Sequence, residues 1–475
     1  MTRDISEAQI RYITTTIRPA TQQDHKDGQQ SHQKIHLSPW DLKSLVRPYM
    51  QRGLLFANPK QRKQDAEKII TQLKTSLSCA LDHFYPLAGR IATTAHDDNT
   101  VSFFIDCKPA GAEFVHASAD VTIAEIMDST HVPRIVQHSF FTLNDVVNYD
   151  GRSKPLLSIQ VTELIDGFFV GCSINHTVCD GKSFWLFFNS WCEISRRGSS
   201  AGDQHISCLP IFDRSCLMNN MEKDLPIRFP LSTVESWQGY KYIPPPLDER
   251  VFIFTEENIA KLKAKANSNI TAFALNQTAK EDADHKKVII SSLQAVLAHV
   301  WVAVTRARCL DPNEVTVYYL AIGATGRLNP PLPKLFFGNS SMGEAATAKV
   351  SELLEVGGFE LGASLLNAVV RSFDDAKIRS FGKSWMKKPE VNKMDYYLSN
   401  NSLQTGGSPR FNMFGNDFGC GEPIAVRSGS ANKCDGKITS TPGPVSGSIG
   451  IEACLSAKTL KALENDTEFM RYITI

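Results

Sequence analysis

The sequence lacks the features that mark several large classes of protein. It has no run of eighteen apolar residues that predicts a membrane-spanning helix, and its first residues lack the apolar core of a secretory signal. Lys and Arg number 51 against 50 Asp and Glu, so the net charge of +1 provides no bulk attraction for nucleic acid. We therefore expect a cytoplasmic protein that neither spans a membrane nor binds nucleic acid.

Familiar metal and cofactor motifs are also missing. The 11 cysteines are scattered, with no CxxC pair and no Cys/His spacing typical of zinc, so we expect reduced thiols and no metal site. The sequence contains neither a Walker loop nor a Rossmann glycine fingerprint. A GxSxG nucleophile elbow is absent because residues 171–175 end in Asn175. These absences disfavour nucleotide-binding folds and GxSxG hydrolases.

The hydrophobic pattern predicts a mixture of helices and strands. Helical spacing or helix-end signals occur in four segments: 66–84, 181–194, 291–308 and 456–468. Short apolar runs predict strands at 156–161, 167–174, 315–323 and 447–455. Because the two kinds of element do not alternate strictly, we expect an α/β sandwich of mixed sheets rather than a Rossmann sheet.

Two polar stretches indicate how the chain is divided. Residues 195–242 have isolated prolines and little periodicity, which is typical of a crossover between domains, and residues 267–287 are polar enough for a surface excursion. We predict an N-terminal domain at 1–219 and a C-terminal domain at 220–475.

The sharpest candidate for catalysis is His176, which follows a predicted strand and precedes Asp180 and Gly181. A histidine at such a turn is held by rigid elements and can reach a cavity between layers. Its ordinary pKa of about 6.5 suits proton transfer near neutral pH. On these features alone, a buried structural histidine remains the alternative, and the neighbouring Cys179 is a weaker candidate nucleophile.

The HxxxD spacing alone is not specific, because it occurs a second time at His116 and Asp120. No glycine follows Asp120, and we interpret Asp120 as the N-cap of a helix that starts at residue 121. His116 therefore serves as an internal control for His176.

A second distinctive string occupies residues 416–423, where two glycines follow Asp417. The Asp417 carboxylate can accept hydrogen bonds from neighbouring amides or bind a cation, and a structural turn is the favoured interpretation. Further along, residues 427–433 form a basic Gly/Ser-rich loop that suits a phosphate.

Taken together, these strings resemble the plant BAHD acyltransferases. Residues 176–181 resemble the family's HxxxDG motif, and residues 417–421 resemble its DFGWG signature. Three further strings match in order, at 85–90, 328–333 and 337–339. The resemblance extends over most of the chain, from residue 17 to residue 470.

The resemblance implies a two-domain fold of the chloramphenicol-acetyltransferase-like type, with a solvent channel between the domains. It implies a monomeric enzyme that transfers an acyl group from acyl-CoA, as co-substrate, to a hydroxyl or amine of a plant specialised or surface-polymer metabolite. His176 would act as general base, without an acyl-enzyme and without a permanently bound cofactor.

The resemblance also assigns roles to individual residues. Asp180, Gly181 and Arg327 would be structural, with Arg327 pairing with Asp180, and Asp417 would be structural rather than catalytic. The implied contacts with CoA are Ser291, Ser292, Ser428, Gly429, Asn432 and Lys433. A position at the start of a predicted helix supports the first two, because helix N-termini attract anions.

Three departures from the family pattern leave two alternatives open. Cys420 replaces the tryptophan of the signature, residues 323–326 lack an acid and an arginine, and Asn175 stands where many members have histidine. The alternatives are a non-catalytic partner protein and a lyase acting on an acyl conjugate. Retention of His176 weighs against the first, because a scaffold needs no base.

Overall fold

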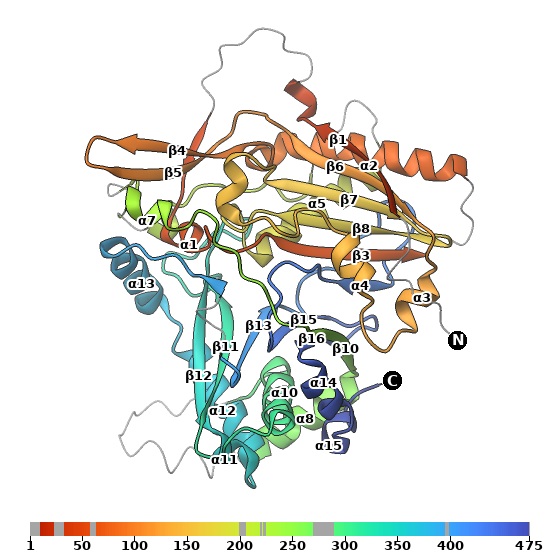
Figure 1. Ribbon diagram of the computed structural model, residues 1–475, viewed down its shortest axis with the longest axis vertical. Coiled ribbons are helices and arrows are strands. Elements are labelled where there is room, and N and C mark those ends of the chain that lie inside the picture. Colours follow the sequence, from red (N-terminus) through yellow and green to blue (C-terminus); the bar gives the residue numbers. More distant parts are fainter. Residues whose placement is uncertain are drawn as a thin grey trace.

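The computed structural model describes residues 10–22, 33–57, 63–198, 206–218, 221, 225–268, 289–394 and 399–474. Its strands form two large mixed sheets and one smaller sheet, and helices cover them (Figure 1). The expected mixed-sheet α/β fold is confirmed. None of the helices in the described ranges has the length and apolar composition needed to cross a bilayer.

The first large sheet has six strands, shown in the upper part of Figure 1. In spatial order they are β1 (Ile10–Ile17), β6 (Ala112–Ala119), β7 (Leu157–Glu163), β8 (Gly167–Ile174), β3 (Met50–Ala57) and β14 (Ala425–Arg427). Only the pair β6 and β7 is parallel. Helices α2 (Lys63–His83) and α5 (Gly181–Arg197) pack together, and the Trp191 indole of α5 donates to the Ser76 hydroxyl of α2 at 3.1 Å.

The second large sheet also has six strands. In spatial order they are β10 (Asp248–Phe254), β16 (Ile449–Leu455), β15 (Lys437–Pro442), β13 (Ser402–Gly407), β11 (Val315–Gly323) and β12 (Ser341–Lys349). Its helices include α8 (Glu256–Ser268), α10 (Ser292–Arg308), α12 (Gly358–Arg371) and α14 (Ala457–Glu464). Helix α10 is buried nearly all round because α8, α12 and α14 all contact it.

The third sheet contains β2 (Lys34–His36), β5 (Thr100–Asp106), β4 (Arg90–His96) and β9 (Arg228–Pro230). The remaining helices in the described ranges are η2 (Ala20–Gln22), α1 (Pro39–Leu42), η3 (Tyr85–Ala88), α3 (Ile123–Met127), α4 (Arg134–Ser139), η4 (Asn148–Arg152), α6 (Ser215–Met218), α7 (Leu231–Glu235), α11 (Val350–Leu354), α13 (Asp375–Lys387) and α15 (Thr467–Met470).

The second half of the chain contributes short strands to the sheets of the first half. Strand β14, from the second half, pairs with β3 of the first large sheet, and β9 pairs with β5 of the small sheet. The predicted domain boundary between residues 219 and 220 lies outside the described residues and stays a prediction. Most of the predicted surface excursion, from residue 269 onward, also lies outside them.

Two local predictions about helix ends were wrong. The closing helix is divided into α14 and α15, because Asp466 accepts bonds from the amides of Glu468 and Phe469 and starts a new helix. The N-cap of α3 is Thr122 rather than Asp120. The Thr122 hydroxyl accepts a hydrogen bond from the Glu125 amide, and the Glu125 carboxylate accepts one from the Thr122 amide, in a capping box that Asp120 cannot form from its position.

Candidate active site

Two adjoining cavities lie beside the start of α5, and strands of both large sheets line one of them. We call the smaller one the histidine cavity: it has a volume of about 180 Å³, and His176, Arg47 and Lys437 line it. The larger α10 cavity has a volume of about 720 Å³, and the first turn of α10 lines it. Gly181 and Phe411 belong to the walls of both cavities, so the two spaces meet beside the start of α5.

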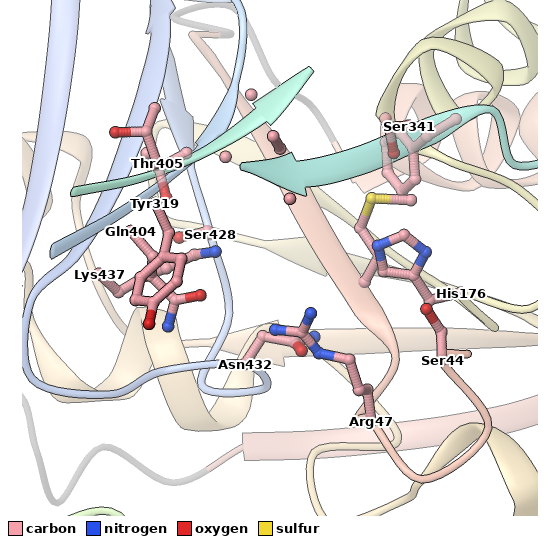
Figure 2. Close-up of a pocket in the computed structure, with 18 of the residues that line it drawn as sticks. Ser44, Arg47, His176, Tyr319, Ser341, Gln404, Thr405, Ser428, Asn432 and Lys437 are labelled. Atoms are coloured by element: carbon pink, nitrogen blue, oxygen red, sulfur yellow. The ribbon is translucent and has the colours of Figure 1, made fainter. Parts of the chain in front are cut away.

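His176 follows β8 directly and is fixed through its backbone. Its amide donates to the Asn148 side-chain oxygen at 2.7 Å, and its carbonyl accepts from the Asn339 side-chain amide at 2.9 Å. The ring nitrogen Nδ1 is buried and forms no hydrogen bond with any described residue. In Figure 2 the imidazole and Lys437 lie on opposite sides of the Arg47 guanidinium. The backbone is therefore held in place while the ring stays available to a substrate.

The surroundings of His176 keep its ring neutral. Burial, together with the positive charges of Arg47, Lys43 and Lys437, lowers the pKa of His176 to about 4. A ring with this pKa is unprotonated at neutral pH and can accept a proton, as a general base must.

This shift predicts the pH dependence of catalysis. Below a pKa of about 4 His176 would be protonated and inactive, whereas above it the base is available. Arg47, Lys43 and Lys437 face the ring, and both lysines, with pKa values of about 8, stay charged to near that pH. We expect kcat/KM to vary by less than about twofold between pH 5.5 and 7.5, since this parameter reports ionisations of the free enzyme. A sigmoid centred near pH 6.5 in initial-rate measurements would contradict the assignment.

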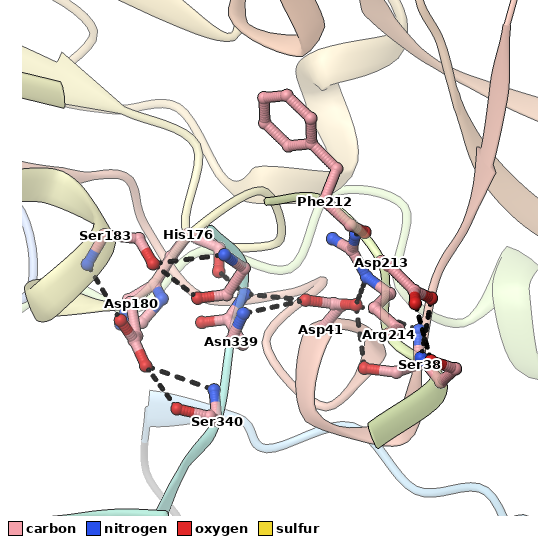
Figure 3. Close-up of polar contacts among 12 residues, drawn as sticks. Ser38, Asp41, His176, Asp180, Ser183, Phe212, Asp213, Arg214, Asn339 and Ser340 are labelled. Carbon is pink, nitrogen blue, oxygen red and sulfur yellow. Dashed lines mark hydrogen bonds and ion pairs between the residues drawn. The ribbon is translucent and has the colours of Figure 1, made fainter. Parts of the chain in front are cut away.

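Asp180 is the N-cap of α5 and does not pair with Arg327, so that expectation was wrong. One carboxylate oxygen accepts from the amides of Lys182 and Ser183, both at 3.1 Å, and the other accepts from the Ser340 amide at 3.1 Å and hydroxyl at 3.2 Å (Figure 3). The helix N-terminus and Ser340 thus satisfy both oxygens without an arginine. Arg327 instead donates to the carbonyls of Val370 and Phe373.

Because Asp180 joins α5 to the strand β12 region, Asp180→Ala should lower the free energy of unfolding by about 1–2 kcal/mol, the usual cost of losing an N-cap. Asp180→Asn should lose less, since asparagine also caps helices. Urea unfolding measures both effects. Unchanged stability together with lost activity would instead place Asp180 in the chemical step.

A buried ion pair that the sequence analysis missed supports the histidine loop. The Asp41 carboxylate accepts from Arg214 Nε at 2.9 Å, and its other oxygen accepts from the Asn339 amide nitrogens at 3.2 and 3.0 Å. Since Asn339 also donates to the His176 carbonyl, a continuous chain of contacts runs from Arg214 to the loop (Figure 3). The S-x-x-D capping box that starts at Ser38 and the family string at 337–339 were the available signals.

The predicted CoA contacts do not lie together: two line the α10 cavity, three line the histidine cavity, and Gly429 lines neither. Ser291 and Ser292 line the α10 cavity, and the Ser291 hydroxyl caps α10 by accepting from the Gln294 amide. Lys182, Lys263 and Arg410 line the same cavity, and sequence reasoning had not selected them. The α10 cavity therefore combines a helix N-terminus with cationic side chains, which suits phosphate groups.

Ser428 and Lys433 are engaged elsewhere. Lys433 Nζ lies 2.5 Å from Glu249 and 2.8 Å from Glu452, and it bonds to the Ser428 hydroxyl at 2.7 Å, all in the protein interior. Burial opposes its charge, but the two glutamates outweigh burial and raise the pKa of Lys433. The ammonium is already neutralised, so the predicted phosphate contact does not fit these residues.

Gly429 and Asn432 have structural partners as well. A Cβ on Gly429 would lie 2.2 Å from Gln51 Oε1, which explains the glycine. Asn432 has a left-handed φ of 64°, and its side-chain amide donates to the carbonyls of Pro48 and Tyr49. Asn432 lines the histidine cavity rather than the α10 cavity, which disfavours its predicted role in CoA binding.

Asp417 organises a turn. One of its oxygens accepts from the amides of Gly419, Cys420 and Gly421 at 2.8–2.9 Å, and Asp417 lines neither cavity. A catalytic role for Asp417 is therefore not supported. Cys420, which stands in place of tryptophan, is half-buried against the hydrophobic core that includes Trp191 and Phe418. The rings of these two residues are 4.7 Å apart between centroids.

Cys179, the weaker candidate nucleophile, and His116, the control histidine, both lie outside the site. Cys179 is fully buried, and burial raises its pKa well above the ordinary value, so no thiolate forms near neutral pH. His116 lies on β6 and pairs with Glu163 of β7. Neither residue lines the histidine cavity or the α10 cavity.

Comparison with known proteins agrees with this arrangement. The chain is 38% identical over 451 residues to an uncharacterized acetyltransferase of Arabidopsis thaliana, covering 93% of this chain and 95% of that protein. It is 32% identical to the BAHD acyltransferase DCR of the same organism, over 92% of this chain and 88% of that protein.

The fold is similar to the crystal structure of F. sporotrichioides TRI101 complexed with coenzyme A and T-2, with a TM-score of 0.69 and 16% identity. That likeness covers 93% of this chain and 99% of TRI101. The sequence pattern described as Transferase family matches residues 14–470. The chain therefore belongs to this Transferase family, the BAHD acyl-CoA-dependent acyltransferases.

Proposed function

We propose that His176 is the general base in a direct acyl transfer from acyl-CoA to the hydroxyl or amine of a small plant metabolite. The observation that carries this proposal is the buried His176 imidazole in the histidine cavity, which adjoins the cationic α10 cavity at Gly181; the low pKa of the ring supports its role as a base. A transfer reaction requires a donor and an acceptor, and each cavity would hold one of them.

The donor would occupy the α10 cavity. The CoA phosphates would face the first turn of α10, where Ser291 and Ser292 lie, and the side chains of Lys182, Lys263 and Arg410. The thioester would then reach His176 past Gly181, where even an added Cβ would approach no closer than 3.5 Å to Phe411.

In the chemical step, the acceptor oxygen or nitrogen attacks the thioester carbonyl as His176 takes its proton. The tetrahedral intermediate collapses, the carbon–sulfur bond breaks, and CoA leaves as a thiolate that the protonated His176 can reprotonate. A thiol pKa near 8.5 makes thiolate a much better leaving group than alkoxide, so no acyl-enzyme is required. We further propose that the protein acts as a cytoplasmic monomer in specialised or surface-polymer metabolism.

The direct test is incubation of the purified protein with acetyl-, malonyl- and aromatic acyl-CoA and a plant metabolite extract, followed by mass spectrometry. We expect acylated products that depend on His176, together with free CoA. A protein that consumes no acyl-CoA with any extract would favour the non-catalytic alternative, and cleavage of conjugates without CoA would favour the lyase.

The donor site has a separate test. The double variant Lys182→Gln/Arg410→Gln should raise KM for acyl-CoA about tenfold, which corresponds to about 1.4 kcal/mol of lost binding. The KM for the acceptor should change little, because these side chains line the α10 cavity and not the histidine cavity. Lys461→Gln, on the exposed face of α14, is the matched control. Equal effects on both KM values would contradict the placement of CoA.

A further inference from the structure

The junction between the two cavities is lined mostly by small side chains. Two residues that line both cavities are large: Leu320, which is buried in a hydrophobic core, and Phe411, which is only partly buried. The others are Gly181, Ala321, Ser341, Thr405 and Gly407. Because the proposed donor passes this junction to reach His176, a bulky side chain in its wall limits what can pass.

Phe411 lies opposite Gly181, the first residue of α5. A Cβ added to Gly181 would lie 3.5 Å from Phe411 Cε2 and 3.8 Å from Phe411 Cζ. Apart from its chain neighbours and the backbone of α5, no other described atom would lie within 4 Å of that Cβ. The φ of Gly181 is outside the left-handed region, so the backbone conformation does not require glycine. The glycine instead leaves open the space that the Phe411 ring faces.

The segment that carries Phe411 is fixed in place. Gly407, the last residue of β13, has a φ of 83°, and a Cβ there would lie 2.4 Å from the Ser440 carbonyl oxygen, so this turn requires glycine. Further along, the Phe411 amide donates to the Ser408 carbonyl at 3.3 Å. The Phe411 ring also packs against the hydrophobic core of the first half of the chain. The ring is therefore a fixed part of the junction wall.

The space on the His176 side of the junction is small. The histidine cavity has a volume of about 180 Å³, and it has to hold the acyl group together with the reactive end of the acceptor. A cavity of about 150 Å³ in a protein core holds a single benzene molecule. An aromatic acyl group would therefore take up most of the histidine cavity, whereas an acetyl group leaves room for the acceptor.

We propose that the donor carries a short aliphatic acyl group, and that Phe411 excludes aromatic acyl groups by narrowing the junction over Gly181. The inference rests on the proposed acyl transfer and adds the class of donor. The exclusion is steric, because an aromatic acyl group would have to displace a ring that is packed against the core. Discrimination by such a clash requires no additional contact with the preferred donor.

The binding test uses CoA, acetyl-CoA and benzoyl-CoA, titrated into the protein in a calorimeter without acceptor. We expect the unchanged protein to bind acetyl-CoA at least about tenfold more tightly than benzoyl-CoA, the usual scale of discrimination by pocket size. In Phe411→Ala, benzoyl-CoA should gain most of this factor, while the affinity for CoA should stay the same. Equal affinities of the unchanged protein for the two donors, or an unaltered ratio in Phe411→Ala, would overturn the inference.

A second variant narrows the junction from the opposite side. Gly181→Ala should fold normally, since alanine has the higher helix propensity and its Cβ would make only an ordinary contact with Phe411. Its methyl group fills the open space, so the Kd for acetyl-CoA should rise by at least about tenfold. Adding Phe411→Ala to the same chain should restore most of the affinity. No loss in Gly181→Ala, or a loss that Phe411→Ala does not restore, would contradict the proposed junction.

Phe414→Ala is the matched control. Phe414 lies in the same segment and packs against the same core, but it lines neither the histidine cavity nor the α10 cavity. This variant should keep the preference for acetyl-CoA. The melting temperature of each variant without ligand shows whether it is folded. Loss of the preference in Phe414→Ala as well as in Phe411→Ala would assign the effect to general loosening of the segment and overturn the inference.

The activity test offers equal amounts of acetyl-CoA and benzoyl-CoA together with the plant extract, and compares the products by mass spectrometry. We expect acetylated products from the unchanged protein, and benzoylated products in addition from Phe411→Ala. Benzoylated products from the unchanged protein would overturn the inference while leaving the proposed function intact. No product with either donor would count against the proposed function, and the binding test then decides the inference independently.

Discussion

His176→Ala should lower kcat for acyl transfer by at least about 100-fold, because a positioned general base contributes about 10²–10⁴-fold. The melting temperature should not fall. The loop is held because the His176 amide donates to Asn148 and the His176 carbonyl accepts from Asn339, and alanine retains both bonds. The ring nitrogen Nδ1 has no partner among the described residues to lose. Steady-state rates together with thermal unfolding separate these two effects.

His116→Ala is the control, since His116 shares the HxxxD spacing but lies outside both cavities. It should retain full activity. If His176→Ala kept more than about a tenth of the normal kcat, another group would have to supply the base.

Arg214→Met should be the most destabilising of the changes considered, by about 3–5 kcal/mol, because it leaves a buried carboxylate without its cationic partner. Asp41 is fully buried, and the Arg214 side chain is 8% exposed. Their contact also reaches His176 through Asn339, so kcat should fall in any folded variant. Chemical denaturation measures the stability, and activity below the unfolding transition measures the second effect.

The matched control is the pair formed by Arg228 and Asp98, whose side chains are 47% and 53% exposed. Arg228→Met should cost at most about 1 kcal/mol, since solvent screens exposed ion pairs. Similar losses for Arg214→Met and Arg228→Met would show that the Asp41 pair does not have the structural role described above.

Much of the fold follows from local sequence. The predicted segments at 66–84, 167–174 and 291–308 correspond closely to α2, β8 and α10, because apolar periodicity and capping residues act over a few positions. The pairing of β14 with β3 could not be predicted in the same way. Short strands from distant parts of the chain are brought together by the global packing rather than by their own patterns.

In the candidate site, too, features set by local sequence could be predicted, whereas contacts between distant parts of the chain could not. The position of His176 at a strand-to-helix turn was visible in the sequence, and so was the turn around Asp417. The partner of Asp180 was predicted wrongly, because Ser340 is distant in sequence and carries no charge that would single it out. The positive lining of the histidine cavity was missed for a similar reason: Arg47 and Lys437 are far apart in the chain, and single cations are typical of any surface.

The central claim is that His176 activates an acceptor that attacks acyl-CoA directly. Its most direct test is the initial rate of transfer with acyl-CoA and acceptor both varied. The two adjoining cavities and the inert Cys179 predict a ternary complex, so double-reciprocal plots should give intersecting lines, with no burst of CoA when the acceptor is absent. Parallel lines, with a burst of CoA equal to the enzyme concentration, would show an acyl-enzyme and contradict the account.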